Sequence, residues 1–551
     1  MLDRLLLVFL TALAPALAQP VIFPKGIVNA ASFMTPGLPG GGIARGSVFT
    51  IFGRGIGPAV GAQVAAFPLA ATFQGVSIRV TQGNTSVEAI PVFVLANQVN
   101  AIMPSNTPLG LVSVRLTFNG ARSNPSPVRV VDNSPGLFSA TGVGAGPGVV
   151  LNFISESEQP VNTTVRTAAP GQAVILYGTG LGPIAAPDML APPAGNLPFP
   201  VAVFVGGKAA GPLLYSGRSP CCSGLDQIAF TVPADAPLGC YVPVQVRVGE
   251  QAVSNTVTMA IARDGAACSD AANPFSAPFR AGARTASIRL LRNFFKIEDG
   301  RTTRQFTVDT ACGDFRREIG GELAFDPRLS HPPTGSCAAY TLSGDFLTGI
   351  AYPFQAREYY NVGALTLAGA AGMRAVAASS SPPQIFYSSI VGSTPGRGLP
   401  GTPLVFGPGT VQVRAPGTAS VGPIDVNVPV AAPLDWTNQD QLRMVRRSDG
   451  LVVNWSGSGA GTVIVLGVSV DRPLNASGVF LCLAPPAPQS FTVPPYILAN
   501  LPAARLIRGD TTGLLAFGSI PEGAPAVFST TGLDFAAAFS RTMNWRSVVF
   551  R

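Results

Sequence analysis

The chain has 551 residues, of which 47% are hydrophobic and only 12% are charged, and its formal net charge is +8. This length is too great for one hydrophobic core and predicts three or four domains, while the apolar content excludes a disordered chain. The basic residues are scattered among acids, so we expect no nucleic-acid partner. The 62 glycines and 52 prolines favour a turn-rich, all-β class of protein.

The N-terminus has the pattern of a secretion signal. Arg4 precedes an apolar run at residues 5–13, and Ala16-Leu17-Ala18 suits signal cleavage. A run this short cannot span a bilayer, and no later segment offers 18 uninterrupted apolar residues. We therefore expect residues 1–18 to be a signal peptide. The mature chain is expected to be exported to the periplasm, cell surface or medium, with no stable membrane span after cleavage.

The next region contains an internal repeat. The string Phe52-Gly53-Arg54-Gly55-Ile56-Gly57-Pro58 recurs as Tyr177-Gly178-Thr179-Gly180-Leu181-Gly182-Pro183, and the copies end on Ser123-Asn124 and Ser254-Asn255. A duplicated unit of this size is a folding module. Short alternating strands separated by turn residues, without a helical period, predict two immunoglobulin-like β-sandwiches at residues 24–133 and 134–263.

The Gly-x-Gly-x-Gly-Pro element of each copy does not fit a dinucleotide-binding loop. Such a loop needs glycines that open a helix. Here Pro58 and Pro183 follow the glycines directly, and no helical pattern comes next. We interpret the glycines as positions of positive φ in a tight bend that leaves a strand, and we expect no cofactor.

Several strings in this region resemble one family. They are Asn29-Ala30-Ala31-Ser32-Phe33, the two glycine bends, Gln98-Val99-Asn100 and Pro135-Gly136-Leu137-Phe138. Over residues 24–263 the chain resembles an uncharacterised, duplicated β-sandwich region of secreted soil-bacterial proteins, which is similar to IPT/TIG-type immunoglobulin-like domains. The resemblance implies extracellular placement and a pair of β-sandwiches, and it supplies no catalytic residues.

Seven cysteines fit an oxidising compartment. We expect one disulfide between Cys312 and Cys337, and another that joins Cys240 to Cys221 or Cys222. Zinc ligation is the competing interpretation. The sequence has no CxxC pair and a single histidine, so we expect no metal site.

The second half of the chain is expected to hold one or two further β-rich domains, at residues 270–390 and 395–551. Residues 287–297 favour a strand that returns through residues 305–308, although a helix over residues 286–297 remains open. A Ser/Pro cluster at residues 379–383 suggests the boundary between the two domains.

Two tryptophans in this half, Trp436 and Trp455, lie near expected strand ends. We interpret both as core residues of a sandwich. The alternative is a surface platform in which Trp436 and Trp455, together with Tyr359-Tyr360, stack on sugar rings.

Catalytic signals are weak. No Gly-x-Ser-x-Gly element occurs, and the single histidine, His331, lies in a proline-rich loop where we expect a surface residue. A glycoside hydrolase needs two acids across a cleft. Asp314 and Glu318 are four residues apart and could share a helical face, which makes them the candidate pair. The arginines interleaved with these acids favour a solvated, salt-bridged surface.

We therefore expect a non-catalytic, exported, multi-domain protein with a structural or adhesive role at the cell surface. Its partner would be a surface protein or a polysaccharide. The first alternative is a carbohydrate-binding protein. The second is a carboxylate-dependent glycoside hydrolase centred on residues 280–340.

Overall fold

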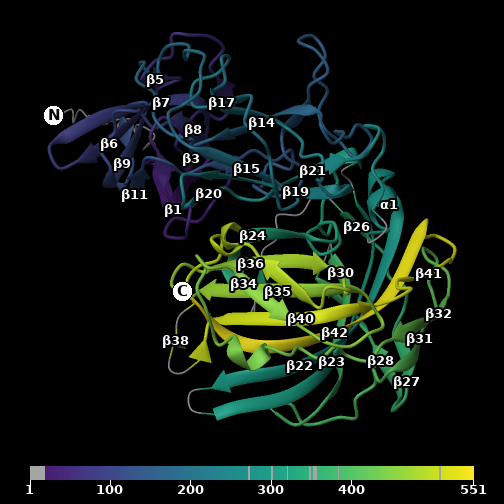
Figure 1. The fold of residues 1–551 in the computed structure, drawn as a ribbon. Coiled ribbons are helices and arrows are strands. Elements are labelled where there is room, and N and C mark those ends of the chain that lie inside the picture. Colours follow the sequence, from purple (N-terminus) through teal and green to yellow (C-terminus); the bar gives the residue numbers. More distant parts are fainter. Residues whose placement is uncertain are drawn as a thin grey trace, which may run out of the picture.

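The computed structural model describes residues 19–270, 273–299, 302–318, 321–345, 349–350, 357–381, 384–396, 398–504, 506–507 and 510–551. The expected signal peptide, residues 1–18, lies outside them. The described chain is built almost wholly of β-strands (Figure 1), which confirms the all-β class. Its helices are two short α-helices, α1 (Ser276–Arg280) and α2 (Pro495–Leu498), and two 3-10 turns, η1 (Gly321–Leu323) and η2 (Gln439–Gln441). Among the described residues no helix has the length and apolar character needed to cross a membrane.

The first β-sandwich has two sheets joined through one long strand. Its strands are β1 (Val21–Asn29), β2 (Ile43–Ala44), β3 (Val48–Arg54), β4 (Ala62–Gln63), β5 (Thr72–Phe73), β6 (Val76–Gln82), β7 (Thr85–Leu95), β8 (Gln98–Ile102), β9 (Gly110–Phe118), β10 (Ala121–Arg122) and β11 (Ser126–Val131). The first half of β7 pairs with β6 and the second half with β8, so this strand belongs to both layers. Alternating residues such as Ile78 and Val80 fill the space between the layers.

The second β-sandwich has two separate sheets. Its strands are β12 (Gly136–Leu137), β13 (Val150–Asn152), β14 (Ala173–Thr179), β15 (Val201–Val205), β16 (Lys208–Ala209), β17 (Tyr215–Arg218), β18 (Asp226–Thr231), β19 (Gly239–Val248), β20 (Ala252–Val253) and β21 (Val257–Ile261). One sheet has the order β12-β14-β18-β17 and the other β16-β15-β19-β20. Val174 and Phe230 from the first sheet meet Val244 from the second in a buried core. The tandem pair of sandwiches predicted from the repeat is thereby confirmed.

The Ser-Asn pair that ends each repeat does the same work in both sandwiches. Asn124 accepts a hydrogen bond from the Ile22 backbone N–H (2.8 Å) and donates one to the Ile22 carbonyl (3.1 Å). Asn255 makes the same two bonds with Leu137 (2.7 and 3.0 Å). In each copy the preceding serine accepts a hydrogen bond from a backbone N–H of the neighbouring strand. The pair therefore links the first strand of each sandwich by hydrogen bonds to the segment that leads into its last strand.

The glycine bends have the conformation that the sequence predicts. Gly55 and Gly180 have φ values of 64° and 96°, a region that favours glycine. Gly53 and Gly178 occupy equivalent repeat positions, and a Cβ at either would collide with a carbonyl oxygen of the paired strand. The motif therefore serves close strand pairing in both copies.

The remainder of the chain forms one unit that contains a 15-stranded, a four-stranded and a two-stranded sheet. Its strands are β22 (Arg284–Asp299), β23 (Thr302–Glu318), β24 (Ser336–Asp345), β25 (Gly349–Ile350), β26 (Arg357–Tyr359), β27 (Leu365–Gly369), β28 (Gly372–Val376), β29 (Ala378–Ser381), β30 (Gln384–Ser393), β31 (Gly409–Ala415), β32 (Ile424–Val430), β33 (Met444–Val445), β34 (Leu451–Asn454), β35 (Ala460–Asp471), β36 (Ala476–Ala484), β37 (Ser490–Val493), β38 (Leu506–Ile507), β39 (Asp510–Thr511), β40 (Gly513–Pro521), β41 (Ala526–Phe528) and β42 (Phe535–Phe550). The longest path through the 15-stranded sheet is β25-β24-β36-β35-β40-β42-β22-β23-β30-β29. We call residues 273–551 the C-terminal unit.

This strand order bears on whether residues 270–551 form one domain or two, which the sequence leaves open. β24 pairs with β36, and β22 pairs in parallel with β42, so strands from both expected domains alternate in one sheet. Residues 270–390 and 395–551 are therefore parts of one unit. β22 and β23 form a long antiparallel hairpin, which confirms the expected strand at residues 287–297 and excludes the helix.

The disulfides differ from those expected. The structure joins Cys337 to Cys482, Cys240 to Cys268, and the neighbours Cys221 and Cys222 to each other. Cys312 is a free thiol on β23. Five strands separate β23 from β24, which carries Cys337. At about 4.8 Å per strand step this spacing far exceeds the reach of a disulfide, so the expected Cys312–Cys337 bridge is wrong.

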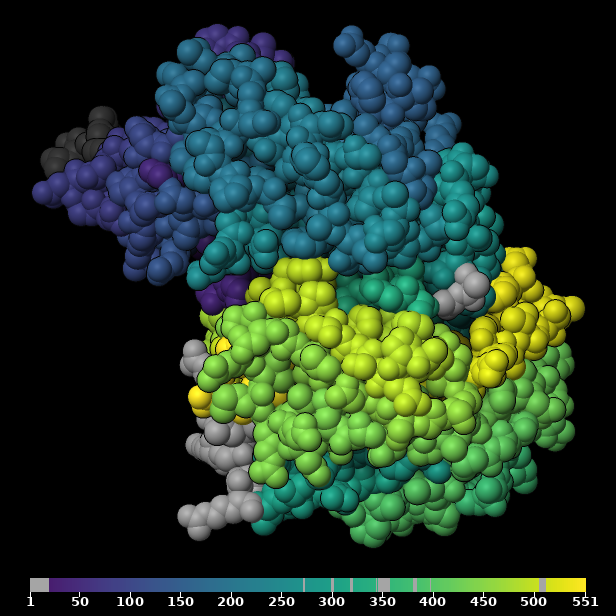
Figure 2. Space-filling view, viewed as in Figure 1, coloured from purple at the N-terminus to yellow at the C-terminus, as the bar shows by residue number. Residues whose placement is uncertain are grey.

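The sandwiches pack against the C-terminal unit rather than hanging from a linker (Figures 1 and 2). Phe204 of the second sandwich stacks on Tyr496, with ring centroids 4.2 Å apart. Tyr241 and Phe325 meet in a small core beside the Cys240–Cys268 disulfide. Two of the cavities described below lie along these junctions.

Candidate functional site

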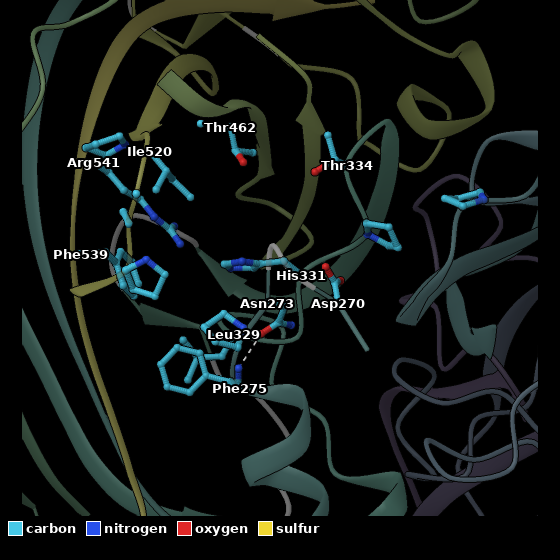
Figure 3. Close-up of a pocket in the computed structure, with 18 of the residues that line it drawn as sticks. Asp270, Asn273, Phe275, Leu329, His331, Thr334, Thr462, Ile520, Phe539 and Arg541 are labelled. Carbon is cyan, nitrogen blue, oxygen red and sulfur yellow. Dashed lines mark hydrogen bonds between the residues drawn. The ribbon is translucent and has the colours of Figure 1, made fainter. Parts of the chain in front are cut away.

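A cavity of about 520 Å³ lies between the second sandwich and the C-terminal unit (Figure 3). The turn before β19 supplies Pro237 and Leu238, and the segment that leads into α1 supplies Phe275. Leu329 and Phe539 add to its apolar wall. The polar side chains that line it are Asp270, Asn273, His331, Thr334, Thr462 and Arg541.

A tight turn presents His331 to this cavity. The Asp326 carboxylate accepts the Arg328 backbone N–H (2.9 Å), and the Ser330 hydroxyl accepts the Asp326 N–H (3.0 Å). His331 follows Ser330 directly, and its Nε2 lies 2.8 Å from the Arg328 carbonyl oxygen. Because a carbonyl only accepts, Nε2 carries the proton of the neutral ring, which leaves Nδ1 as an acceptor.

His331 is buried and neutral. Its relative exposure is 8%, which corrects the expectation of a surface residue. Burial and the nearby Arg541 cation lower its pKa to about 3. A ring with this pKa is a hydrogen-bonding group at neutral pH and does not suit general-base chemistry near pH 7.

Two buried donors in the cavity have no protein acceptor in the described part of the chain. The Asn273 side chain is 2% exposed, and its Oδ1 accepts the Phe275 N–H at 3.2 Å, whereas Nδ2 has no partner. Arg541 lies 4.8 Å from the Phe539 ring centroid, and its Nε is also unmatched. Burial, with a contribution from Arg289, lowers the pKa of Arg541 to about 9, so it is a cation at pH 7. Unpaired buried donors are uncommon in folded proteins, and these two are available to a molecule bound in the cavity.

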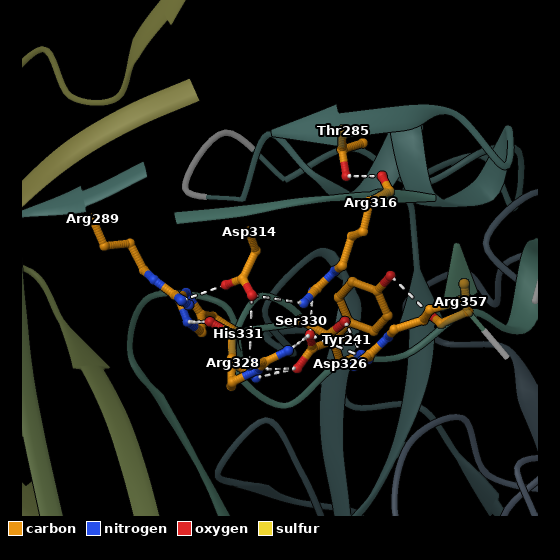
Figure 4. Close-up of polar contacts among 11 residues, drawn as sticks. Tyr241, Thr285, Arg289, Asp314, Arg316, Asp326, Arg328, Ser330, His331 and Arg357 are labelled. Atoms are coloured by element: carbon orange, nitrogen blue, oxygen red, sulfur yellow. Dashed lines mark hydrogen bonds and ion pairs between the residues drawn. The ribbon is translucent and has the colours of Figure 1, made fainter. Parts of the chain in front are cut away.

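A network of ion pairs stabilises the turn that carries His331 (Figure 4). Asp326 is fully buried and pairs with Arg316, with Arg328 at 3.2 Å and with Arg357 at 3.3 Å. Burial alone would raise the pKa of Asp326, but these three guanidinium groups lower it well below its usual range. The carboxylate therefore stays ionised and holds the turn in place.

The acid pair predicted for a hydrolase does not form as expected. Asp314 and Glu318 lie on β23, an extended strand, so they share no helical face. Burial opposes ionisation of Asp314, but Arg289, Arg316 and Arg328 outweigh it and lower its pKa. A glycosidase needs one carboxyl group that keeps its proton, and Asp314 does not suit that role. The side chain of Glu318 lies outside the described residues.

Both predicted stacking tryptophans are in the core. Trp436 and Trp455 are 5% and 3% exposed, and their rings lie 5.7 and 5.6 Å from Phe517. Their indole N–H groups bond to Asn438 and to the Pro486 carbonyl. They form no surface platform, so the core interpretation is the one the structure supports.

The cavity residues themselves have no local signature in the sequence. Asn273, Thr462 and Arg541 come from segments far apart in the chain, and only the folded sheet brings them together. Within the described ranges no group of three His, Cys, Asp or Glu side chains could hold a metal ion.

No protein-family model matches this chain, and no curated protein matches it. Solved structures with some likeness include a Bacteroides ovatus mixed-linkage glucan utilisation protein, SGBP-B (10% identity, 81% of this chain and 79% of that chain, TM-score 0.13). Others are domains A168–A170 of titin (11% identity, 68% and 93%, TM-score 0.11) and Sidekick-1 immunoglobulin domains 1–5 (11% identity, 96% and 99%, TM-score 0.13). TM-scores this low mean that the arrangements differ, so these likenesses carry no argument about function.

Proposed function

We propose that this protein is an exported, non-catalytic binding protein whose junction cavity takes a sugar unit of a polysaccharide. The observation that carries the proposal is the pair of unmatched buried donors, on Asn273 and Arg541, which lie beside the apolar residues Phe275 and Phe539 in a cavity of about 520 Å³. This volume is typical of small-ligand sites, which combine apolar walls with a few fixed polar groups.

The chemistry of the lining fits a polyhydroxylated ring. Arg541 and Asn273 donate, His331 accepts through Nδ1, and the hydroxyl groups of Thr334 and Thr462 can do either. The ring of Phe539 and its apolar neighbours would cover the C–H faces of the sugar. Thr462 lies on β35 and Arg541 on β42, two strands of the large sheet that are separated by β40. Because the sheet holds both strands in place, little ordering entropy would be lost on binding.

Two finer assignments belong to the same proposal. We infer that the sandwiches are of the IPT/TIG type, since the two glycine bends, which carry part of the resemblance, have equivalent structural roles in the two copies. We also infer that residues 1–18 direct export, because three disulfides suit an oxidising compartment.

The proposal is tested by titrating cello-, xylo- and malto-oligosaccharides into residues 19–551 in a calorimeter. Thr462→Val removes one hydroxyl group at nearly constant side-chain volume. It should lower the affinity for the oligosaccharide that the wild type binds by about tenfold, which corresponds to about 1.4 kcal/mol. Arg541→Gln should lower the affinity further. The control is Thr410→Val, the same change at an exposed strand position outside the cavity.

The proposal fails if the folded wild-type protein binds none of these sugars. It also fails if both cavity variants bind as tightly as Thr410→Val. If a cavity variant loses binding and also loses the circular dichroism spectrum of the folded protein, the loss of binding is not specific. Thr334→Val then serves instead, because it removes a second hydroxyl group on a loop of the same cavity and should also weaken binding.

A further inference from the structure

A second cleft, of about 720 Å³, lies where all three units meet, and it shares no lining residue with the cavity above. Pro39 comes from the first sandwich, and Arg247 and Glu250 come from the end of β19 and its turn in the second. Arg447 and Tyr496 come from the C-terminal unit. A ligand that contacts all these residues must be larger than a single inorganic ion.

Arg247 is held in this cleft by an aromatic stack rather than by an acid. Its guanidinium carbon lies 5.6 Å from the Phe204 ring centroid, and Phe204 stacks on Tyr496 at 4.2 Å. The Nε atom is buried without an acceptor, and no ion pair to Arg247 occurs among the residues that the structure describes. The rings therefore fix the orientation of the cation and leave its Nε without an acceptor.

Arg447 is the second cation of the cleft. One of its terminal nitrogens donates to the Leu501 carbonyl at 2.6 Å, which fixes the side chain, while its Nε is buried without an acceptor. Burial lowers the pKa of Arg447, which reflects the cost of holding this charge away from water. In the described chain no acidic side chain pairs with it, and the one acidic side chain among the lining residues, that of Glu250, is exposed.

We propose that this cleft binds the carboxylate or sulfate groups of an acidic polysaccharide, with Arg247 and Arg447 as its two anion ligands. Guanidinium groups recognise both anions through paired N–H donors. A saccharide also offers a ring to Tyr496 and a chain long enough to cross the junction of three units. This site goes beyond the proposed function, since it is separate from the sugar cavity and selects for charge.

The test measures binding of immobilised residues 19–551 to polygalacturonate, dextran sulfate, neutral dextran and polyglutamate at 50 and 300 mM NaCl. We expect binding to one or both acidic polysaccharides, none to dextran, and weaker binding at the higher salt. The two acidic probes separate carboxylate from sulfate recognition. The double variant Arg247→Gln/Arg447→Gln should bind at least tenfold more weakly.

Two further variants test whether the effect of charge on binding is confined to the cleft. Glu250→Gln removes the opposing charge at an exposed turn, where folding is not at risk, and should tighten binding two- to threefold. Arg115→Gln removes one positive charge, as each single cleft substitution does, but at an exposed strand position of the first sandwich, and it should have no effect.

The proposal is overturned if dextran or polyglutamate binds as tightly as the acidic polysaccharides. It is also overturned if Arg115→Gln weakens binding as much as the cleft variants do, or if Glu250→Gln leaves binding unchanged. Arg541→Gln should not alter this interaction, so the proposal for the cleft and the proposal for the sugar cavity can be tested independently of each other.

Discussion

His331 makes folding stability depend on pH in a range where few other groups titrate. Its pKa is about 3 in the folded protein, whereas an unfolded histidine has a pKa of about 6.5. Between these values the unfolded chain binds more protons than the folded one, so stability falls as the pH falls through this window.

Between pH 7 and pH 5 the free energy of unfolding should drop by about 2 kcal/mol, because about 1.5 pH units lie below the unfolded pKa. Urea denaturation at the two pH values measures this drop. His331→Gln keeps an N–H donor for the Arg328 carbonyl and should abolish most of the pH dependence. The chain has one histidine, so an unchanged drop in the variant would contradict the burial of His331.

Asn255 is expected to be the more important of the two repeat asparagines. Its side chain makes hydrogen bonds to the Leu137 N–H, the Leu137 carbonyl and the Gly144 carbonyl, all buried. Asn255→Ala should destabilise the protein by about 3 kcal/mol, because backbone groups lose their partners. The matched variant Asn124→Ala removes two bonds in a less buried place and should cost less. Equal or reversed costs in denaturant titrations would contradict this order.

At the scale of single residues, local chemistry was readable from the sequence and burial was not. The conformation of Gly55 and Gly180 followed from the spacing of glycine and proline alone. His331 was expected at the surface because its neighbours are prolines, yet the fold of the C-terminal unit buries it. Periodicity does not report such long-range contacts.

At the scale of elements, the Cys337–Cys482 disulfide links two paired strands of the large sheet. The two residues are direct cross-strand partners on β24 and β36, with Cα atoms 4.0 Å apart, and they are 145 residues apart in sequence. Replacing both with serine should destabilise the unit by up to about 5 kcal/mol in the loop-entropy model. Urea denaturation of the oxidised proteins measures the difference, and the control Cys312→Ser should be nearly neutral.

Peptide mapping without reduction provides a direct test of the same pairing. Alkylation before digestion should modify Cys312 alone and leave Cys337 linked to Cys482. A Cys312–Cys337 peptide would contradict the strand order of the sheet. The expected pairing failed because closeness in sequence suggested closeness in space, whereas five strands lie between the two residues.

The β22–β23 hairpin could be predicted, because its strands are neighbours in the chain and alternate in polarity. The parallel pairing of β22 with β42 could not. It joins Thr285 to Phe535 and leaves no local pattern in either segment. The same limit applies to the cavity proposed to bind a sugar, whose polar lining residues span positions 270–541.

At the scale of the whole molecule, the interleaved sheet determines how the C-terminal unit can be divided. β42 has 16 residues and is paired on one side with β40 and on the other with β22. A fragment of residues 270–390 lacks β42 and β36, so β22 and β24 would expose unpaired edges. A fragment of residues 395–551 would expose the opposite edges. Long unpaired edges lead to aggregation rather than folding.

We therefore expect residues 264–551 to give a protease-resistant unit, while residues 270–390 and 395–551 expressed separately give none. Limited proteolysis and amide-proton dispersion in NMR spectra measure this for each fragment. Mixing the two fragments should restore protection if each supplies the edges that the other lacks. A dispersed spectrum from either fragment alone would show that the boundary near residue 390 separates independent domains. In that case β22 and β42 would pair only by docking, rather than as neighbours in one cooperative sheet.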